Sequence, residues 1–145
     1  MSLTVSYVPK ELLHTCWDQI QPYMEGAAEY TRGRYTAENI RECIKDYDYQ
    51  LWIAYEKENN EIGILGAVVT RIETYPNKRY VSMVFCGGIG LNIWKDAMIA
   101  TLRRFAQDNH CDGIEATARP GWAKIFKNDG HKPLWATFEL PLVKE

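Results

Sequence analysis

The segment from Arg79 to His110 constrains the fold of this chain more than any other part of the sequence. It starts with the β-rich run Arg79-Tyr-Val-Ser-Met-Val-Phe85, continues as Cys86-Gly-Gly-Ile-Gly90, and ends in a long run with helical periodicity. One apolar stripe repeats there at the spacing of a 3.6-residue helix: Trp94, Ala97, Met98, Thr101, Leu102 and Phe105. The segment predicts a strand, a glycine joint and a helix.

The three glycines of this joint need a reason, because Gly is unfavourable in both helices and strands. Glycines let the backbone approach a ligand closely and point the first N–H groups of a helix outward, which suits a phosphate. A tight strand–helix turn without a ligand explains the same glycines. The joint alone leaves both interpretations open.

Length and composition bound the class of protein. A chain of 145 residues with 46% hydrophobic and 25% charged residues is typical of one globular domain, residues 1–145. The net charge of −2 gives no reason to expect nucleic acid as a partner. No apolar run approaches the ~20 residues of a membrane span, and the N-terminus lacks signal-peptide features. We expect no membrane partner and a cytoplasmic location.

The four cysteines show no metal-ligand spacing, and we expect them to be reduced thiols: Cys16, Cys43, Cys86 and Cys111. No metal site is predicted. Cys86 adjoins the helix start, where a thiol can become nucleophilic, but no acid or His is near in sequence. We interpret it as a buried structural thiol.

The first half of the chain predicts a strand and two helices. The strand covers Leu3–Val8, and a helix from about Leu13 ends near Pro22, with a short helical piece through Met24. Residues 26–35 read as an exposed loop. Thr36 is expected to cap the second helix.

The second half predicts a β-meander, the long helix and further strands. The expected elements are strands at 49–56, 62–75, 79–85 and 114–119, a brief helix at 122–128 and a last strand from Leu134 to Val143. The order is β-α-α-β-β-β-α-β-α-β, an α/β fold with a mixed, twisted six-stranded sheet and helices on both faces. The long helix makes its two flanking strands parallel. Ligands bind beyond the carboxyl ends of such strands, which favours a phosphate-bearing ligand at the joint.

This order and the glycine joint resemble the GNAT superfamily of N-acetyltransferases. Phe85-Cys-Gly-Gly-Ile-Gly90 is similar to the family's pyrophosphate loop, Q/R-x-x-G-x-G/A, with Phe85 in place of Gln or Arg. Ala123 to His131 has the spacing of A-x-x-L-Y-x-x-x-G-F, with Phe126 in place of the Tyr that often protonates the leaving thiolate. Arg119-Pro-Gly-Trp122 is similar to a segment of small bacteriophage GNAT-like proteins.

The resemblance implies acetyl-coenzyme A as co-substrate and an unidentified amine as acceptor. The N–H groups of Gly88 to Leu91 would hold the pyrophosphate, and the strand that ends at Phe85 would offer backbone to the pantetheine arm. The cofactor-binding residues implied are Val84, Phe85, Cys86, Gly87, Gly88, Ile89, Gly90, Leu91, Arg119 and Trp122.

Two residues are candidates for proton transfer. Glu115 could relay the amine proton if burial raises its pKa, or it could be a solvated residue on the polar face of a strand. Tyr80 could replace the missing thiolate-protonating Tyr, with His131 as the alternative, and the spacing argues for neither over the other. Arg119 is expected either to bind a phosphate or carboxylate, or to pair with Glu115.

The substitutions at 85 and 126 and the absence of an acid in the strand at 79–85 support a second hypothesis. In it, the chain is a catalytically inactive GNAT-fold binding or structural module, possibly phage-encoded. A homodimer, through a helix face or the Leu134–Val143 strand, and a protein partner both remain open.

Overall fold

A single twisted sheet organises the computed structural model, which describes residues 2–118, 122, 125, 128 and 130–142. The sheet has five strands in the order β1-β2-β3-β4-β5. Their bounds are β1 Ser2–Val8, β2 Gln50–Glu58, β3 Glu61–Thr74, β4 Arg79–Gly88 and β5 Gly113–Ala116. The first four are antiparallel neighbours, and β4 and β5 are parallel.

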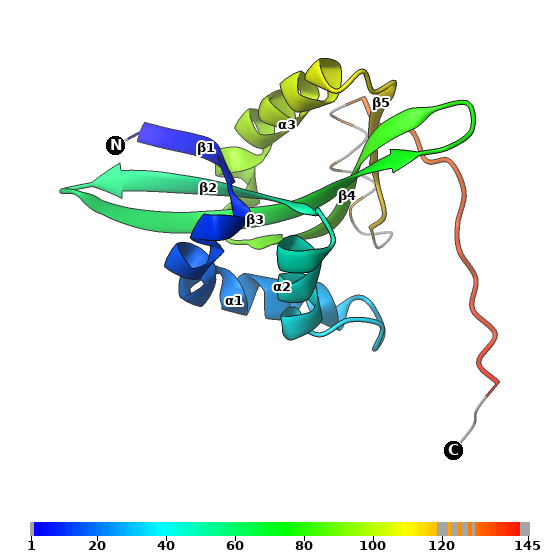
Figure 1. Cartoon of the computed structure of the whole chain (residues 1–145), viewed down its shortest axis with the longest axis horizontal. Coiled ribbons are helices and arrows are strands. Elements are labelled where there is room, and N and C mark those ends of the chain that lie inside the picture. Colours follow the sequence, from blue (N-terminus) through cyan, green and yellow to red (C-terminus); the bar gives the residue numbers. More distant parts are fainter. Residues whose placement is uncertain (1, 119–121, 123–124, 126–127, 129, 143–145) are drawn as a thin grey trace.

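The helices cover both faces of this sheet, as predicted. A short 3-10 turn, Lys10–Leu12, leads into α1 (Leu13–Glu29), which lies with α2 (Ala37–Asp46) on one face; α3 (Leu91–Asp108) lies on the other (Figure 1). Thr36 caps α2 as expected: its hydroxyl accepts from the Asn39 N–H (3.1 Å), and its own N–H donates to the Asn39 side chain (2.9 Å). This reciprocal pair satisfies donors that a helix start leaves without partners.

Each face has its own core. The α1–α2 side buries Leu13, Trp17, Ile20, Ile40, Ile44, Val69 and Phe85, among others. The α3 side buries Trp52, Val68, Met83, Trp94, Met98 and Leu102. Three buried members of the second core, at 94, 98 and 102, belong to the apolar stripe that predicted α3, so this stripe fixes how α3 packs on the sheet.

One extra residue interrupts β4. Phe85 pairs with Val69 and Met83 pairs with Thr70, so Val84 has no opposite residue on β3. An extra residue of this kind is a β-bulge, which bends the strand and increases its twist. The bulge lies directly after the last residue of β4 that pairs with β5, Met83.

The first helix is longer than the sequence predicts. α1 continues through Pro22 to Glu29, so the exposed connection is confined to residues 30–36 and the predicted end near Pro22 is wrong. Proline in a helix removes one hydrogen bond to the carbonyl four residues earlier. Here that residue, Asp18, and Pro22 itself are both exposed, so water can solvate the freed carbonyl.

The predicted last strand is also wrong in the part that can be assessed. Residues 131–142 are extended but form no strand, so the sheet has five strands and the expected sixth is missing. Figure 1 shows this segment running away from the sheet. The brief helix predicted at 122–128 lies mostly outside the described residues. None of the helices in the described part of the chain is long and apolar enough to span a membrane.

Candidate functional site

The candidate site begins where β4 and β5 part. β5 pairs with β4 only from Tyr80 to Met83, whereas β3 follows β4 as far as Gly88. From Val84 to Gly88, the edge of β4 that faces β5 therefore has no strand partner among the described residues. Unpaired backbone N–H and C=O groups at such an edge can bind an extended, amide-containing ligand.

Close packing explains why two positions of the joint between β4 and α3 are glycines. A Cβ at Gly87 would collide with the Tyr23 carbonyl of α1, whose carbon would be 2.9 Å away. A Cβ at Gly88 would lie 2.5 Å from the Leu65 carbonyl oxygen, and the φ of Gly88 is +149°. These glycines allow α1 and β3 to approach β4 closely, whether or not a ligand binds.

Gly90 differs from these two glycines. Its φ of +61° is left-handed, which Gly adopts without the penalty of a Cβ, and it forms the N-cap of α3 without a side-chain cap. The Ile89 N–H donates to the Leu65 carbonyl (2.8 Å), but the N–H groups of residues 90–92 have no acceptor in the described part of the chain. They form the positive end of the α3 dipole and can receive an anion.

An apolar cavity of about 20 Å³ adjoins this helix start. Its lining residues are Val68, Met83, Cys86, Leu91, Trp94, Lys95, Met98, Ile99 and Trp122. The structure thus brings three predicted site residues together: Cys86, Leu91 and Trp122. Burial raises the pKa of the Cys86 thiol to about 12, so the thiol is neutral and is no nucleophile near neutral pH, although the residue is partly rather than fully buried.

Phe85 does not face this cavity. It is buried in the core on the α1–α2 side, where its ring meets that of Tyr35 edge-on at a centroid distance of 5.0 Å. The residue that replaces the family's Gln or Arg is therefore a core side chain here. Only its backbone remains available to a ligand.

Glu115 lies on the sheet face opposite α3. Its neighbours Ile114 and Ala116 pack against the α3-side core, and side chains alternate along a strand. The Tyr75 hydroxyl donates to Glu115 Oε2 at 2.8 Å. This hydrogen bond, assisted by burial and by the charges of Glu115 and Glu73, raises the pKa of Tyr75 to about 12, so Tyr75 stays a neutral donor.

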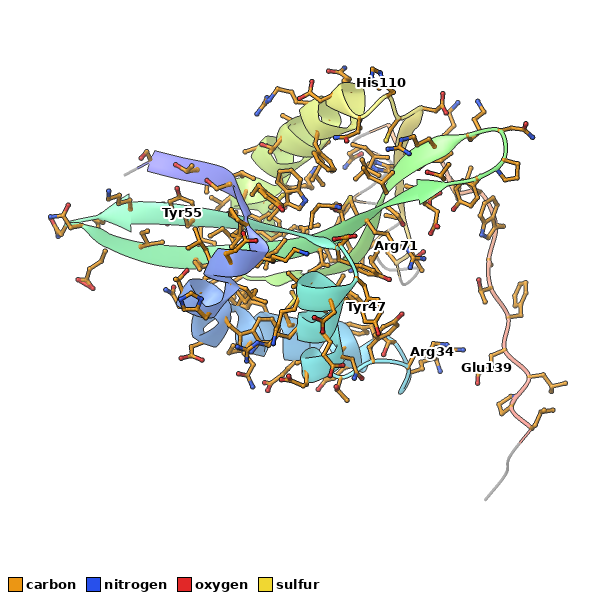
Figure 2. The ribbon with its side chains drawn as sticks, in the orientation of Figure 1. Arg34, Tyr47, Tyr55, Arg71, His110 and Glu139 are labelled. Atoms are coloured by element: carbon orange, nitrogen blue, oxygen red, sulfur yellow. The ribbon has the colours of Figure 1, made fainter. Side chains whose placement is uncertain are left out.

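A polar network continues from Glu115 across the same face. Glu115 pairs in register with Ser82, which is opposite Arg71 on β3. Arg71 donates to the Tyr49 hydroxyl at 2.6 Å and forms a 2.8 Å ion pair with Glu73. Figure 2 shows Arg71 in the middle of the molecule, near the level of the sheet. The candidate base thus has one hydrogen-bond donor, Tyr75, and shares its sheet face with the ion pair of Arg71 and Glu73 on β3.

Tyr80 lies near this network but far from the glycine joint. Its ring meets that of Tyr75 at a centroid distance of 6.0 Å, and it pairs in register with Gly113. Eight residues of strand separate it from Gly88, about 26 Å at 3.3 Å per residue. Tyr80 and Glu115 therefore belong to one end of an elongated site and the anion-binding N–H groups to the other.

Two residues that the sequence singled out, Arg119 and Phe126, lie outside the described residues, and one residue of the site, Tyr75, was not predicted. Tyr75 was missed because it lies at the turn after β3, where its N–H donates to the Lys78 carbonyl and no sequence pattern marks it. Only the register of β4 against β5 reveals its contact with Glu115. Among the described residues, no group of three metal-ligating side chains is assembled.

The fold matches those of solved acetyltransferases. A probable acetyltransferase superposes with a TM-score of 0.70 and 13% identity, over 98% of this chain and 99% of the other. A GNAT-family acetyltransferase from Staphylococcus aureus gives 0.67 at 12% identity, over 98% and 100%. This chain has a GNAT-like fold. The aminoglycoside N-acetyltransferase AAC(6')-Iy, solved in complex with CoA, gives 0.68 at 13% identity, over 98% and 96%.

No protein-family model and no curated protein matches the sequence. The GNAT-like fold predicted from the sequence is thus confirmed by structure alone, at identities that carry no information on substrate. The likeness to bacteriophage proteins stays a prediction.

Proposed function

We propose that this protein is an acyl-coenzyme A-dependent N-acyltransferase, with acetyl-coenzyme A as donor and an amine as acceptor. The observation that carries the proposal is the coincidence of two features at the end of β4. The strand edge is unpaired from Val84 to Gly88, and the N–H groups of residues 90–92 are free in the described part of the chain. A pantetheine arm contains amides that suit the first, and a diphosphate suits the second.

In this proposal the donor runs along the opening between β4 and β5. Its diphosphate binds the N–H groups at the start of α3, and Trp122 lines the apolar wall next to Leu91. Ser82, which pairs in register with Glu115, lies six residues before Gly88, about 20 Å along β4, and Glu115 is on the face where the acceptor would enter. The long separation is filled by the donor's pantetheine arm.

The acyl transfer requires the amine nitrogen to attack the thioester carbonyl, with loss of a proton from nitrogen and departure of the thiolate. Glu115 accepts the amine proton, directly or through water, and the neutral Tyr75 keeps its carboxylate oriented. The thiolate must then be protonated, and Tyr80, whose ring contacts that of Tyr75, is the candidate donor. Because Glu73 is ion-paired with Arg71, Glu115 is the carboxylate on this side that favours a cationic amine as acceptor.

A transfer assay tests the proposal. Acetyl-coenzyme A and a panel of primary amines are incubated with the protein, and released thiol is measured with a chromogenic disulfide. Glu115→Gln should lower kcat by about 10²-fold or more, the usual contribution of a general base, while donor binding is unchanged. Turnover that survives Glu115→Gln at full rate contradicts the assigned role.

The inactive binding module remains the second candidate. The observation in its favour is that Phe85 is a core side chain and offers a ligand only backbone. Donor binding without turnover of any amine in the panel would support that module over the enzyme.

A further inference from the structure

The C-terminal segment at residues 131–142, here called the arm, exposes an unusual amount of apolar surface. The exposed fractions are 65% for Leu134, 77% for Trp135, 91% for Phe138, 83% for Leu140 and 82% for Leu142. Single exposed apolar residues are ordinary, but a contiguous series of this size marks a surface that binds something.

The arm also has the sequence of a strand that is buried on one face. Every second residue from Leu134 to Leu142 is apolar, and Trp135, Thr137, Glu139 and Pro141 alternate with them, so one face is wholly apolar and the other carries one Trp among other residues. This period of two is typical of a half-buried strand. A proline near its end is compatible with an outer strand, where one edge needs no partner. The arm therefore needs a sheet edge to pair with and an apolar surface to cover.

The outer edge of β5 offers both. Among the described residues, β5 pairs only with β4, so no described segment occupies its other edge. On the α3 side, the half-buried Ile114 and Ala116 of this strand pack at the margin of the core. An open edge next to apolar side chains is a ready template for an added strand.

The arm of the same chain does not occupy that edge. Glu139 forms an ion pair with Arg34, in the connection between α1 and α2, at 3.3 Å (Figure 2). Both side chains are about half exposed, so this pair holds the arm weakly. Figure 1 shows the arm passing beyond the end of the sheet. Its large apolar side chains are 65% to 91% exposed.

We infer that the arm crosses to a second copy of this chain and adds a strand to the open edge of its β5. In a two-fold symmetric dimer, one such exchange covers both arms and both β5 edges at once. A one-sided pairing would leave one arm and one edge exposed. The complementarity is thus between two features of the same chain, which makes a second copy the fitting partner.

The exchange has a consequence for the candidate site. β5 carries Glu115, so the arm of the partner lies along the strand of the proposed base and forms a wall of the acceptor side. This step rests on the proposed function, whereas the dimer itself does not. Loss of the dimer and loss of acyl transfer are therefore separate observations.

Light scattering coupled to gel filtration gives the first test. The full chain at about 50 µM should be a dimer, and the double variant Phe138→Glu, Leu140→Glu should be a folded monomer. Tyr47→Glu is the matched control, because Tyr47 is also an exposed aromatic residue, 69% accessible, but is the residue that directly follows α2, away from the arm. It should remain a dimer. A monomeric wild type, or a dimer that survives the double variant, overturns the inference.

Photo-cross-linking locates the arm. A benzoylphenylalanine is placed at position 138, and this protein is mixed with a tagged copy that lacks it. Cross-links from position 138 to residues 113–118 of the tagged copy support the exchange. Cross-links to those residues within one chain, or to any other surface of the tagged copy, contradict it.

Discussion

Gly87→Ala tests whether the glycines of the β4–α3 joint serve packing as well as binding. The new Cβ would meet the carbonyl group of Tyr23 in α1, whose carbon would lie 2.9 Å away. A backbone carbonyl inside a helix cannot rotate aside, so α1 must shift off the sheet or β4 must bend. Overpacking of this kind costs about 1–3 kcal/mol, and the rigid obstacle places Gly87→Ala near 3 kcal/mol.

That free energy translates into measurable shifts. For a chain of this size, each kcal/mol lowers Tm by roughly 2–4 °C, so Gly87→Ala should lower Tm by roughly 6–12 °C. In urea the midpoint should fall by about 1–2 M without a change in slope. Both transitions can be followed by far-UV circular dichroism.

Gly63→Ala is the matched control for this experiment. Gly63 also lies in a β-strand, β3, but a Cβ there would have no heavy atom within 4 Å. Its effect should stay within about 0.5 kcal/mol, as for other exposed positions. If Gly87→Ala is as stable as Gly63→Ala, the packing explanation of the joint is refuted.

Two further results are expected. Thr70→Val should lower the free energy of unfolding by about 1–3 kcal/mol, because the buried Thr70 hydroxyl accepts from Trp52 Nε1 (2.9 Å) and donates to Gln50 (2.8 Å). Thr70→Ser keeps the hydroxyl and should stay close to the wild type. Equal denaturant midpoints for the two variants would contradict this. Cys86 should resist alkylation at pH 8 long after Cys111 reacts, because burial raises the pKa of the Cys86 thiol from 9.0 to about 12. For the same reason, the contribution of the neutral thiol to stability should be complete below pH 9 and should be lost as the pH rises toward 12. Rapid labelling of Cys86 in the folded protein, located by peptide mass spectrometry, would be the contrary outcome.

Much of the fold was predictable because local patterns and packing agree. The stripe at 94, 98 and 102 predicted α3 and its buried face, and Thr36 predicted the start of α2. In both cases the signal lies within a few residues of the feature it determines. Such signals do not depend on register or on distant contacts.

The features that the sequence did not reveal depend on distant contacts. The bulge at Val84 is defined only by the pairing of β4 with β3, and the run from 79 to 88 contains no sign of an extra residue. The bond from Tyr75 to Glu115 joins residues 40 positions apart. Pro22 was misread because a helix-breaking residue is tolerated where its cost falls on exposed backbone.

The strand predicted from Leu134 to Val143 failed for a different reason. Its alternation correctly marks a segment with the character of a strand, but a strand forms only when an edge pairs with it. The arm does not pair with the outer edge of β5 in its own chain, so the sequence pattern and the observed extended segment are both explained if the arm pairs with that edge in another copy.

The central claim is that the start of α3 binds the diphosphate of an acyl-coenzyme A, and calorimetric titration with acetyl-coenzyme A tests it most directly. The variants are Ile89→Glu and Ile89→Gln, since Ile89 is 60% exposed in the joint and both side chains have the same size. Two phosphate charges near a new carboxylate cost about 1–2 kcal/mol in a watery environment, so Ile89→Glu should weaken binding about tenfold. Binding that is tight in the wild type and in Ile89→Gln but weakened in Ile89→Glu supports the claim. No binding heat in any of the three proteins, or equal affinity in all three, contradicts it.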